Sequence, residues 1–375
     1  MTAAKSQNMH RQERGFTLLE LLLATIVFLV VAGAALSLFQ TEQPLLNRQQ
    51  NFAALNISMR NSVAQMQLDM VNAGTGYYPG TNIPDWPVGV TVVNSNPVTA
   101  CNNSTTFTYT STCFDTLNII ATDASTPPAH LDNGTFSFNG TDCIATTASP
   151  IYVYPPTGTT AAALASDYHN GDQLLLVNSS NSQMTTITLS GLAGSGGTAT
   201  TYTSGATTGV KLTFNITNAD GSNSSTNDPL SLTTSLNPKL GTSFCSTDWI
   251  MRLAPVTYQV DTTTASNPKL TRTQAGTTSV LAEQVIGFKV GAIAWNVTDD
   301  TTGYSYNASN SSTASPVGYS NEWWLIRSVQ VALIGRTTPN PDPTFTYRNG
   351  FDGGPYQIAS EIATINPRNL SMNNN

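Results

Sequence analysis

Charged residues are scarce in this chain. Asp, Glu, Lys and Arg make up 10% of its 375 residues, against about 25% in an average soluble protein. Because 22 Asp and Glu outnumber 15 Lys and Arg, the net charge is -7. The chain therefore lacks a broadly basic surface, which argues against nucleic acid as a partner. Thr, Ser, Asn and Gly take the place of charge and favour a neutral, exported surface of strands and loops.

Catalytic motifs are also missing. The chain has three histidines, and we expect His130 and His169 to be exposed loop residues. It contains no G-x-S-x-G, H-E-x-x-H or phosphate-loop motif. We therefore predict that it is no enzyme and holds no cofactor. Asp220–Asn223 and Asp228 resemble a calcium loop only faintly, because the EF-hand pattern is not met. No metal site is predicted, although calcium stays an open alternative.

Long apolar runs are absent except for one, Leu18–Phe39, whose 22 residues are enough to span a bilayer as a helix. Basic side chains precede it at Lys5, His10, Arg11 and Arg14. No Lys or Arg follows until Arg48, so the positive-inside rule keeps the N-terminus in the cytoplasm and exports the rest. A cleaved secretory signal would have a shorter apolar core, and a plain membrane anchor is the other alternative. Glu20 lies near the start of the run, where an isolated charge indicates function.

Residues Gly15–Glu20 read G-F-T-L-L-E. They resemble the G-F-T-L-x-E processing motif of type IV prepilins and of the pseudopilins of type II secretion. The resemblance implies that a prepilin peptidase cuts the Gly15–Phe16 bond, removing a leader of residues 1–15, and that the new amine of Phe16 is methylated. It also implies that Glu20 pairs with the N-terminal amine of a neighbouring subunit. The expected partners are other pilins or pseudopilins, contacted through the N-terminal helix, and the expected locations are the inner membrane before assembly and the periplasm or cell surface afterwards.

The helical pattern continues beyond the membrane face. One apolar stripe is formed by Phe52, Leu55, Met59, Val63, Met66 and Met70, at spacings of three and four that are typical of an amphipathic helix. We expect the stripe to pack on a sheet and the helix to end near Val71, with Gly74 as a left-handed cap. Pro44 predicts a kink or local melting near Leu38–Pro44.

The rest of the chain is predicted to be rich in strands. β-rich runs are Asp115–Ala121, Thr135–Phe138, Ile151–Tyr154, Gln173–Asn178, Thr185–Leu189 and Val210–Ile216, and strictly alternating runs surround Tyr258, Leu270, Phe288 and Val331. Gly191–Gly209 and Asn218–Asn227 are expected to be surface loops. The predicted fold is α+β, with a long N-terminal helix on an antiparallel β-sheet. Its parts are a membrane-spanning helix at 16–43, an amphipathic half at 44–72 and an exported head at 73–375, with polar insertions at about 80–165 and 191–245.

Four cysteines, Cys101, Cys113, Cys143 and Cys245, all lie on the exported side, where disulfides persist. The chain has no C-x-x-C, so a zinc site is not indicated. Three pairings are open. We favour Cys101–Cys113, closing a short loop, and Cys143–Cys245, tying an insertion to the sheet.

Three segments of the head, Val256–Asp261, Lys269–Thr273 and Val280–Val290, resemble PilW-type minor pilins and, second, J-type pseudopilins. Both families share a "Y-x-(apolar)…L-x-R" hairpin. The leading hypothesis is a minor pilin that primes or caps a type IV pilus-like fibre. The alternatives are a type II secretion pseudopilin and a pilus-tip adhesin or DNA-uptake pilin. Trp86, Trp323 and Trp324 could serve adhesion, but packing in the sheet is the preferred interpretation.

Overall fold

In a computed structural model of the chain, the described residues are 17–74, 89–93, 95, 101–132, 143–144, 150–179, 184–214, 244–296, 301–305, 326–339 and 346–371. The leader, the strand expected at Thr135–Phe138, the loop Asn218–Asn227, the calcium-like segment with Asp228, and the three tryptophans discussed above lie outside the described residues. The chain divides into two compact units, Met1–Ala54 and Leu55–Asn375.

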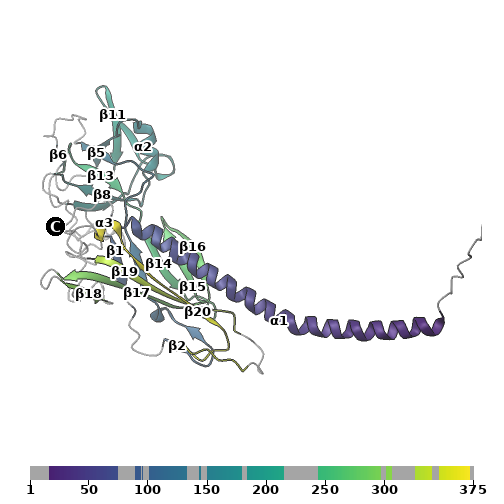
Figure 1. Cartoon of the computed structure of the whole chain (residues 1–375). Helices are drawn as coiled ribbons and strands as arrows, with labels where there is room; N and C mark the ends of the chain where they lie inside the picture. Colours follow the sequence, from purple (N-terminus) through teal and green to yellow (C-terminus); the bar gives the residue numbers. More distant parts are fainter. Residues whose placement is uncertain are drawn as a thin grey trace, which may run out of the picture. The chain divides into compact units, whose positions relative to one another are not determined.

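One helix, α1, runs from Leu18 to Val71 (Figure 1). Of the kink or local melting expected near Leu38–Pro44, the melting is wrong, because the helix continues through Pro44; the kink stays a prediction. A proline removes its own N–H bond to the carbonyl four residues earlier. That carbonyl belongs to Gln40, an exposed residue, so water can replace the lost partner.

The amphipathic stripe of α1 is confirmed. Leu55, Met59, Val63, Met66 and Met70 are at most 7% exposed, and Phe52 is half-buried. The left-handed cap is confirmed too. Gly74 has φ of 74°, a conformation that costs a glycine little, and its N–H donates to the Ile120 carbonyl at 2.9 Å.

Two antiparallel sheets lie next to this part of α1 (Figure 1). The first has the order β1 (Val90–Val93), β4 (Thr116–Ile119), β14 (Val256–Asp261), β15 (Lys269–Gln274) and β16 (Thr277–Glu283). The second has the order β18 (Thr301–Ser305), β17 (Val285–Asn296), β19 (Ile326–Arg336) and β20 (Ile358–Ile365). The predicted hairpin is present as β14–β15, and the alternation in β19 buries Val329, Val331 and Leu333 as predicted.

A single residue, Gln284, joins the two sheets between β16 and β17. Its φ is 57°, a value uncommon for a residue with a side chain. The buried Arg336 holds it in place, because Arg336 Nε donates to Gln284 Oε1 at 2.7 Å and Arg336 N to the Gln284 carbonyl at 2.9 Å.

The chain leaves the first sheet after β4, builds a third sheet, and returns at β14. This seven-stranded sheet has the order β10 (Thr200–Ser204), β11 (Thr207–Leu212), β7 (Ile151–Tyr154), β5 (Ala129–Asp132), β13 (Trp249–Arg252), β8 (Gln173–Val177) and β9 (Met184–Thr188). Helix α2 (Ala161–Asp167) buries Ala161, Leu164 and Ala165 in the same core as the inner face of the sheet. The head therefore contains a second hydrophobic core.

Short elements complete the described part. They are the pairs β2 (Asn102–Asn103) with β3 (Thr108–Tyr109) and β6 (Cys143–Ile144) with β12 (Phe244–Cys245), the 3-10 turns η1 (Ser111–Cys113) and η2 (Ser195–Gly197), and helix α3 (Arg368–Ser371).

The surface loop expected at Gly191–Gly209 is wrong. Residues 200–204 form β10, which pairs with β11 across a turn at Gly205. Leu192 is the only long aliphatic side chain in the sequence of this segment, so its composition resembles that of a loop. Its threonines and Tyr202 suit a pleated surface, and Leu192 and Ala199 reach the core of the seven-stranded sheet.

Candidate functional site

The start of α1 is organised by Thr17 and Glu20. The backbone N–H and the hydroxyl of Thr17 each donate to Glu20 Oε2 at 3.0 Å, and the Glu20 N–H lies 3.3 Å from Thr17 Oγ1. This reciprocal arrangement is a capping box, with Thr17 as the N-cap. The carboxylate thus lies at the positive end of the helix dipole. The T-x-x-E spacing in the sequence carried this signal, but the sequence reasoning assigned Thr17 no role.

Gly15 and Phe16, the predicted processing residues, lie outside the described residues. Covalent connectivity alone places Phe16 next to Thr17, whose backbone N–H already binds Glu20. Cleavage after Gly15 would therefore create an amine one residue away from the group that holds the carboxylate.

The first part of α1 is apolar and exposed. Its large hydrophobic side chains from Leu18 to Phe39 are at least half exposed. By length and composition α1 is able to cross a membrane. Because these side chains have no covering within the described residues of the chain, burial must come from lipid or from other molecules.

The far end of α1 is held on the first sheet by one carboxylate. Arg272 donates from Nε to Asp69 Oδ2 at 2.7 Å and from Nη2 to Asp69 Oδ1 at 3.1 Å. The Tyr258 hydroxyl donates to the same Oδ2. These hydrogen bonds raise the pKa of the Arg272 guanidinium, while burial, followed by the bond to Asp69, raises the pKa of the Tyr258 hydroxyl. We call Asp69, Tyr258 and Arg272 the helix clamp.

The helix clamp explains part of the pattern that resembled minor pilins. Tyr258 and Arg272 are the tyrosine and arginine of the "Y-x-(apolar)…L-x-R" hairpin. Leu270, the leucine of the same pattern, is fully buried. Sequence reasoning missed Asp69. The only signal was an acidic residue placed next to Met70, at the edge of the buried stripe.

The four cysteines are paired in the structure as Cys101–Cys113 and Cys143–Cys245. The first closes a loop of the β2–β3 pair, and the second joins β6 to β12. A disulfide restricts the unfolded chain, so both pairs would stabilise the head.

His130 and His169 differ in their surroundings. The loop position expected for His130 is wrong, because it lies in β5, half-buried, with its ring centroid 3.6 Å from that of Trp249. Burial lowers the pKa of His130. His169 is exposed, as expected, and its Nδ1 lies 3.8 Å from Asp172 Oδ2. Within the part of the chain that the structure describes, no three His, Cys, Asp or Glu side chains gather as a metal site requires.

Comparison with known families finds the prokaryotic N-terminal methylation motif at residues 10–36. This match, together with the long apolar helix and the antiparallel sheets, supports a type IV pilin-like prepilin, a class that includes pseudopilins. Proteins of this class are structural, are processed by prepilin peptidase and assemble with other pilins. The motif and the apolar helix are consistent with anchoring in a membrane before assembly. Neither the curated proteins nor the solved structures contain a match to the chain.

Proposed function

We propose that this chain is a minor pilin, a non-catalytic subunit that primes or caps a type IV pilus-like filament. Residues 1–15 are the leader, 16–43 the helix of the fibre core, 44–72 the amphipathic half and 73–375 the exported head. The observation that carries the proposal is the capped carboxylate of Glu20, located inside the matched methylation motif.

The capping box supplies a physical route to assembly. In the isolated chain, Glu20 accepts hydrogen bonds from the neutral Thr17 N–H and hydroxyl. The amine on Phe16 of a neighbouring subunit carries a full positive charge, so it adds a charge–charge attraction to the carboxylate that the neutral Thr17 donors do not supply. In an apolar environment either charge alone is penalised, so the pair favours leaving the bilayer as part of a bundle.

The head supports a minor rather than a major subunit. Its described residues form three sheets of four or more strands and two disulfides, and so large a domain would crowd a densely packed fibre wall. The resemblance to PilW-type proteins points the same way. The proposed destination is the tip or the surface of the fibre, beyond the inner membrane.

The first test measures processing and the role of Glu20. We expect the mature protein from its native host to begin with a methylated Phe16 in mass spectrometry. Glu20→Ala should still be cleaved but should enter sheared fibres about tenfold less, equivalent to about 1.4 kcal/mol. Glu42→Ala is the matched control, because Glu42 is an exposed glutamate of the same helix. Normal incorporation of Glu20→Ala would reject the assembly role.

Immunogold labelling of sheared fibres tests the place of the subunit. Label at the tip or sparsely along the fibre is the expected result. Dense label along the shaft would mean a major subunit. Absence of label from the fibres, with the processed protein retained in the envelope, would favour a pseudopilin of type II secretion instead.

A further inference from the structure

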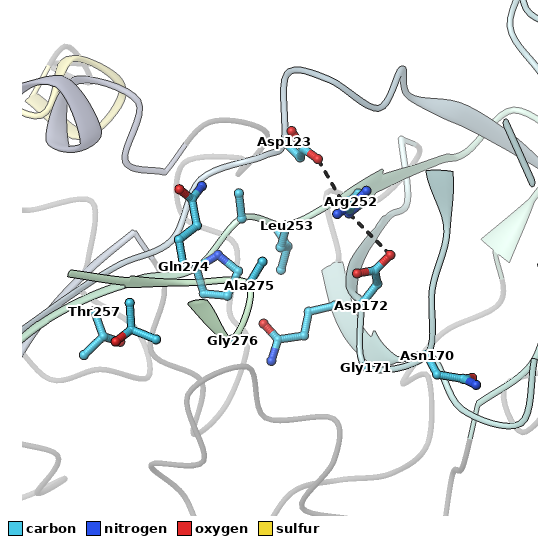
Figure 2. A pocket seen from close by; sticks show the side chains of 14 residues that line it. Asp123, Asn170, Gly171, Asp172, Arg252, Leu253, Thr257, Gln274, Ala275 and Gly276 are labelled. Carbon is cyan, nitrogen blue, oxygen red and sulfur yellow. Dashed lines mark ion pairs between the residues drawn. The ribbon is translucent and has the colours of Figure 1, made fainter. Parts of the chain in front are cut away.

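A pocket of about 520 Å³ with a mixed polar and apolar lining lies where the first sheet meets the seven-stranded sheet (Figure 2). Its wall is formed by residues 170–173 before and at the start of β8, by residues 252–255 at the end of β13 and after it, and by residues 273–276 at the end of β15 and in the turn to β16, together with Asp123 and Thr257. Ligand sites commonly lie between packed substructures. The pocket belongs neither to the N-terminal motif nor to the helix clamp.

The pocket is built on two connecting segments, 121–123 and 252–254, that pair antiparallel through an isolated bridge between Thr122 and Leu253. The chain enters the seven-stranded sheet past Asp123 and leaves it through Leu253 and Ala254. The Asp123 N–H donates to the Arg252 carbonyl at 2.7 Å, the Ala254 N–H to the Ala121 carbonyl at 2.8 Å, and the Leu253 N–H to the Gln173 carbonyl at 2.7 Å. These bonds preform the pocket, so a ligand would not have to order it.

Arg252 stands between two carboxylates on the wall of the pocket (Figure 2). Its Nε lies 3.5 Å from Asp123 Oδ2 and 3.4 Å from Asp172 Oδ2. Its Nη1 donates to the Asp167 carbonyl at 2.6 Å and to Thr126 Oγ1 at 3.3 Å. Because two carboxylates face one guanidinium, an anionic ligand is disfavoured here.

Both sides of the Arg252–Asp172 pair keep unused hydrogen-bonding capacity. Arg252 Nη2 donates to no described residue, and Asp172 Oδ1 accepts from none, since the bond from the His169 N–H at 2.7 Å goes to Oδ2. The Asp172 side chain is 16% exposed and that of Arg252 is 21% exposed. A donor beside a charged acceptor fits two neighbouring hydroxyl groups, one accepting from the guanidinium and one donating to the carboxylate.

The remaining wall has the same mixed character. Gln274 offers an amide from the opposite side (Figure 2), while Leu253 and Pro255 offer apolar surface for C–H groups. From this arrangement we propose that the pocket binds a neutral saccharide through a pair of adjacent hydroxyl groups. The activity goes beyond the assembly role and does not depend on it, because the pocket lies in the head and not in the fibre helix.

Binding of printed glycans by the full chain tests the proposal. The chain is solubilised in a zwitterionic detergent without a sugar head group, since a glycosidic detergent would compete. Neutral oligosaccharides are printed beside their sialylated and sulfated counterparts. We expect binding to neutral glycans, weakened about tenfold or more by an added acidic group.

Gln274→Trp is the decisive variant, because it fills the pocket without removing the Arg252 ion pairs. It should weaken glycan binding about tenfold or more and leave the unfolding temperature unchanged. Gln357→Trp is the matched control, since Gln357 is exposed and does not line the pocket, and its binding should equal that of the wild type. The proposal is overturned if the wild type binds no neutral glycan better than Gln274→Trp does, or if it prefers acidic glycans.

Discussion

At the scale of single residues, two ion pairs of equal length have unequal surroundings. The Arg272–Asp69 and Lys269–Glu283 pairs both have an N–O distance of 2.7 Å. The side chains of the first are 17% and 14% exposed, whereas those of the second are 32% and 57% exposed. Exposed ion pairs contribute about 0–1 kcal/mol to the free energy of unfolding. Removing one partner of a buried pair costs more, because the remaining charge has neither solvent nor a counter-ion.

We therefore predict that Asp69→Ala lowers the free energy of unfolding by about 2–4 kcal/mol. It removes the acceptor of both Arg272 and the fully buried Tyr258 hydroxyl. Glu283→Gln is the control and should change the free energy by about 0.5 kcal/mol or less. Denaturant unfolding of the detergent-solubilised chain, followed by tryptophan fluorescence, measures both. Equal effects of the two substitutions would contradict the clamp.

At the scale of elements, α1 approaches the second sheet closely at a glycine of β19. A Cβ added to Gly335 would lie 2.7 Å from Leu55 Cδ1 and 2.9 Å from Met59 Sδ. Both side chains are buried members of the apolar stripe. Because Gly335 has no side chain, the helix packs closely against the strand. A larger residue at this position would push the two elements apart.

Gly335→Ala should destabilise the head by about 1–3 kcal/mol through overpacking. Gly350→Ala serves as the control, because a Cβ there meets nothing within 4 Å and its φ is not positive. The thermal unfolding midpoints of the two variants provide the comparison. If Gly335→Ala unfolds at the wild-type temperature, the helix does not pack as closely as described.

Some of these elements could be predicted from the sequence pattern, and others could not. The stripe from Leu55 to Met70 and the alternation of β14 and β19 were predictable, because each buries one face at a fixed period. The hairpin β10–β11 was not, since its threonines pair at the edge of a sheet whose other strands come from distant parts of the sequence. The position of His130 in β5 was missed for the same reason.

At the scale of the whole molecule, the two disulfides close loops of very different length. Cys101 and Cys113 are 12 residues apart, and Cys143 and Cys245 are 102 residues apart. On the chain-entropy model, closing the shorter loop stabilises the folded state by about 3 kcal/mol, and closing the longer loop stabilises it by about 5 kcal/mol. The longer disulfide spans most of the segment that forms the seven-stranded sheet.

Replacing Cys143 and Cys245 by serine should therefore lower the unfolding temperature more than replacing Cys101 and Cys113. Mass mapping of a non-reduced digest first establishes the pairing in the exported protein. Four free thiols, or a different pairing, would reject it. A larger effect of the short-loop replacement would show that local strain in the native state outweighs the loop entropy.

The sequence by itself determined the contiguous features of this protein. A bilayer-length apolar run and an amphipathic stripe depend on residues close together along the chain, so spacing is enough to read them. Only the tertiary structure decided that Asp69 contacts Tyr258 and Arg272. It also decided that Gln284 joins two sheets. The pocket bordered by Asp123, Asp172 and Arg252 is a third such feature. Those contacts bring together residues far apart in sequence, and their energy depends on burial and three-dimensional geometry that no local pattern encodes.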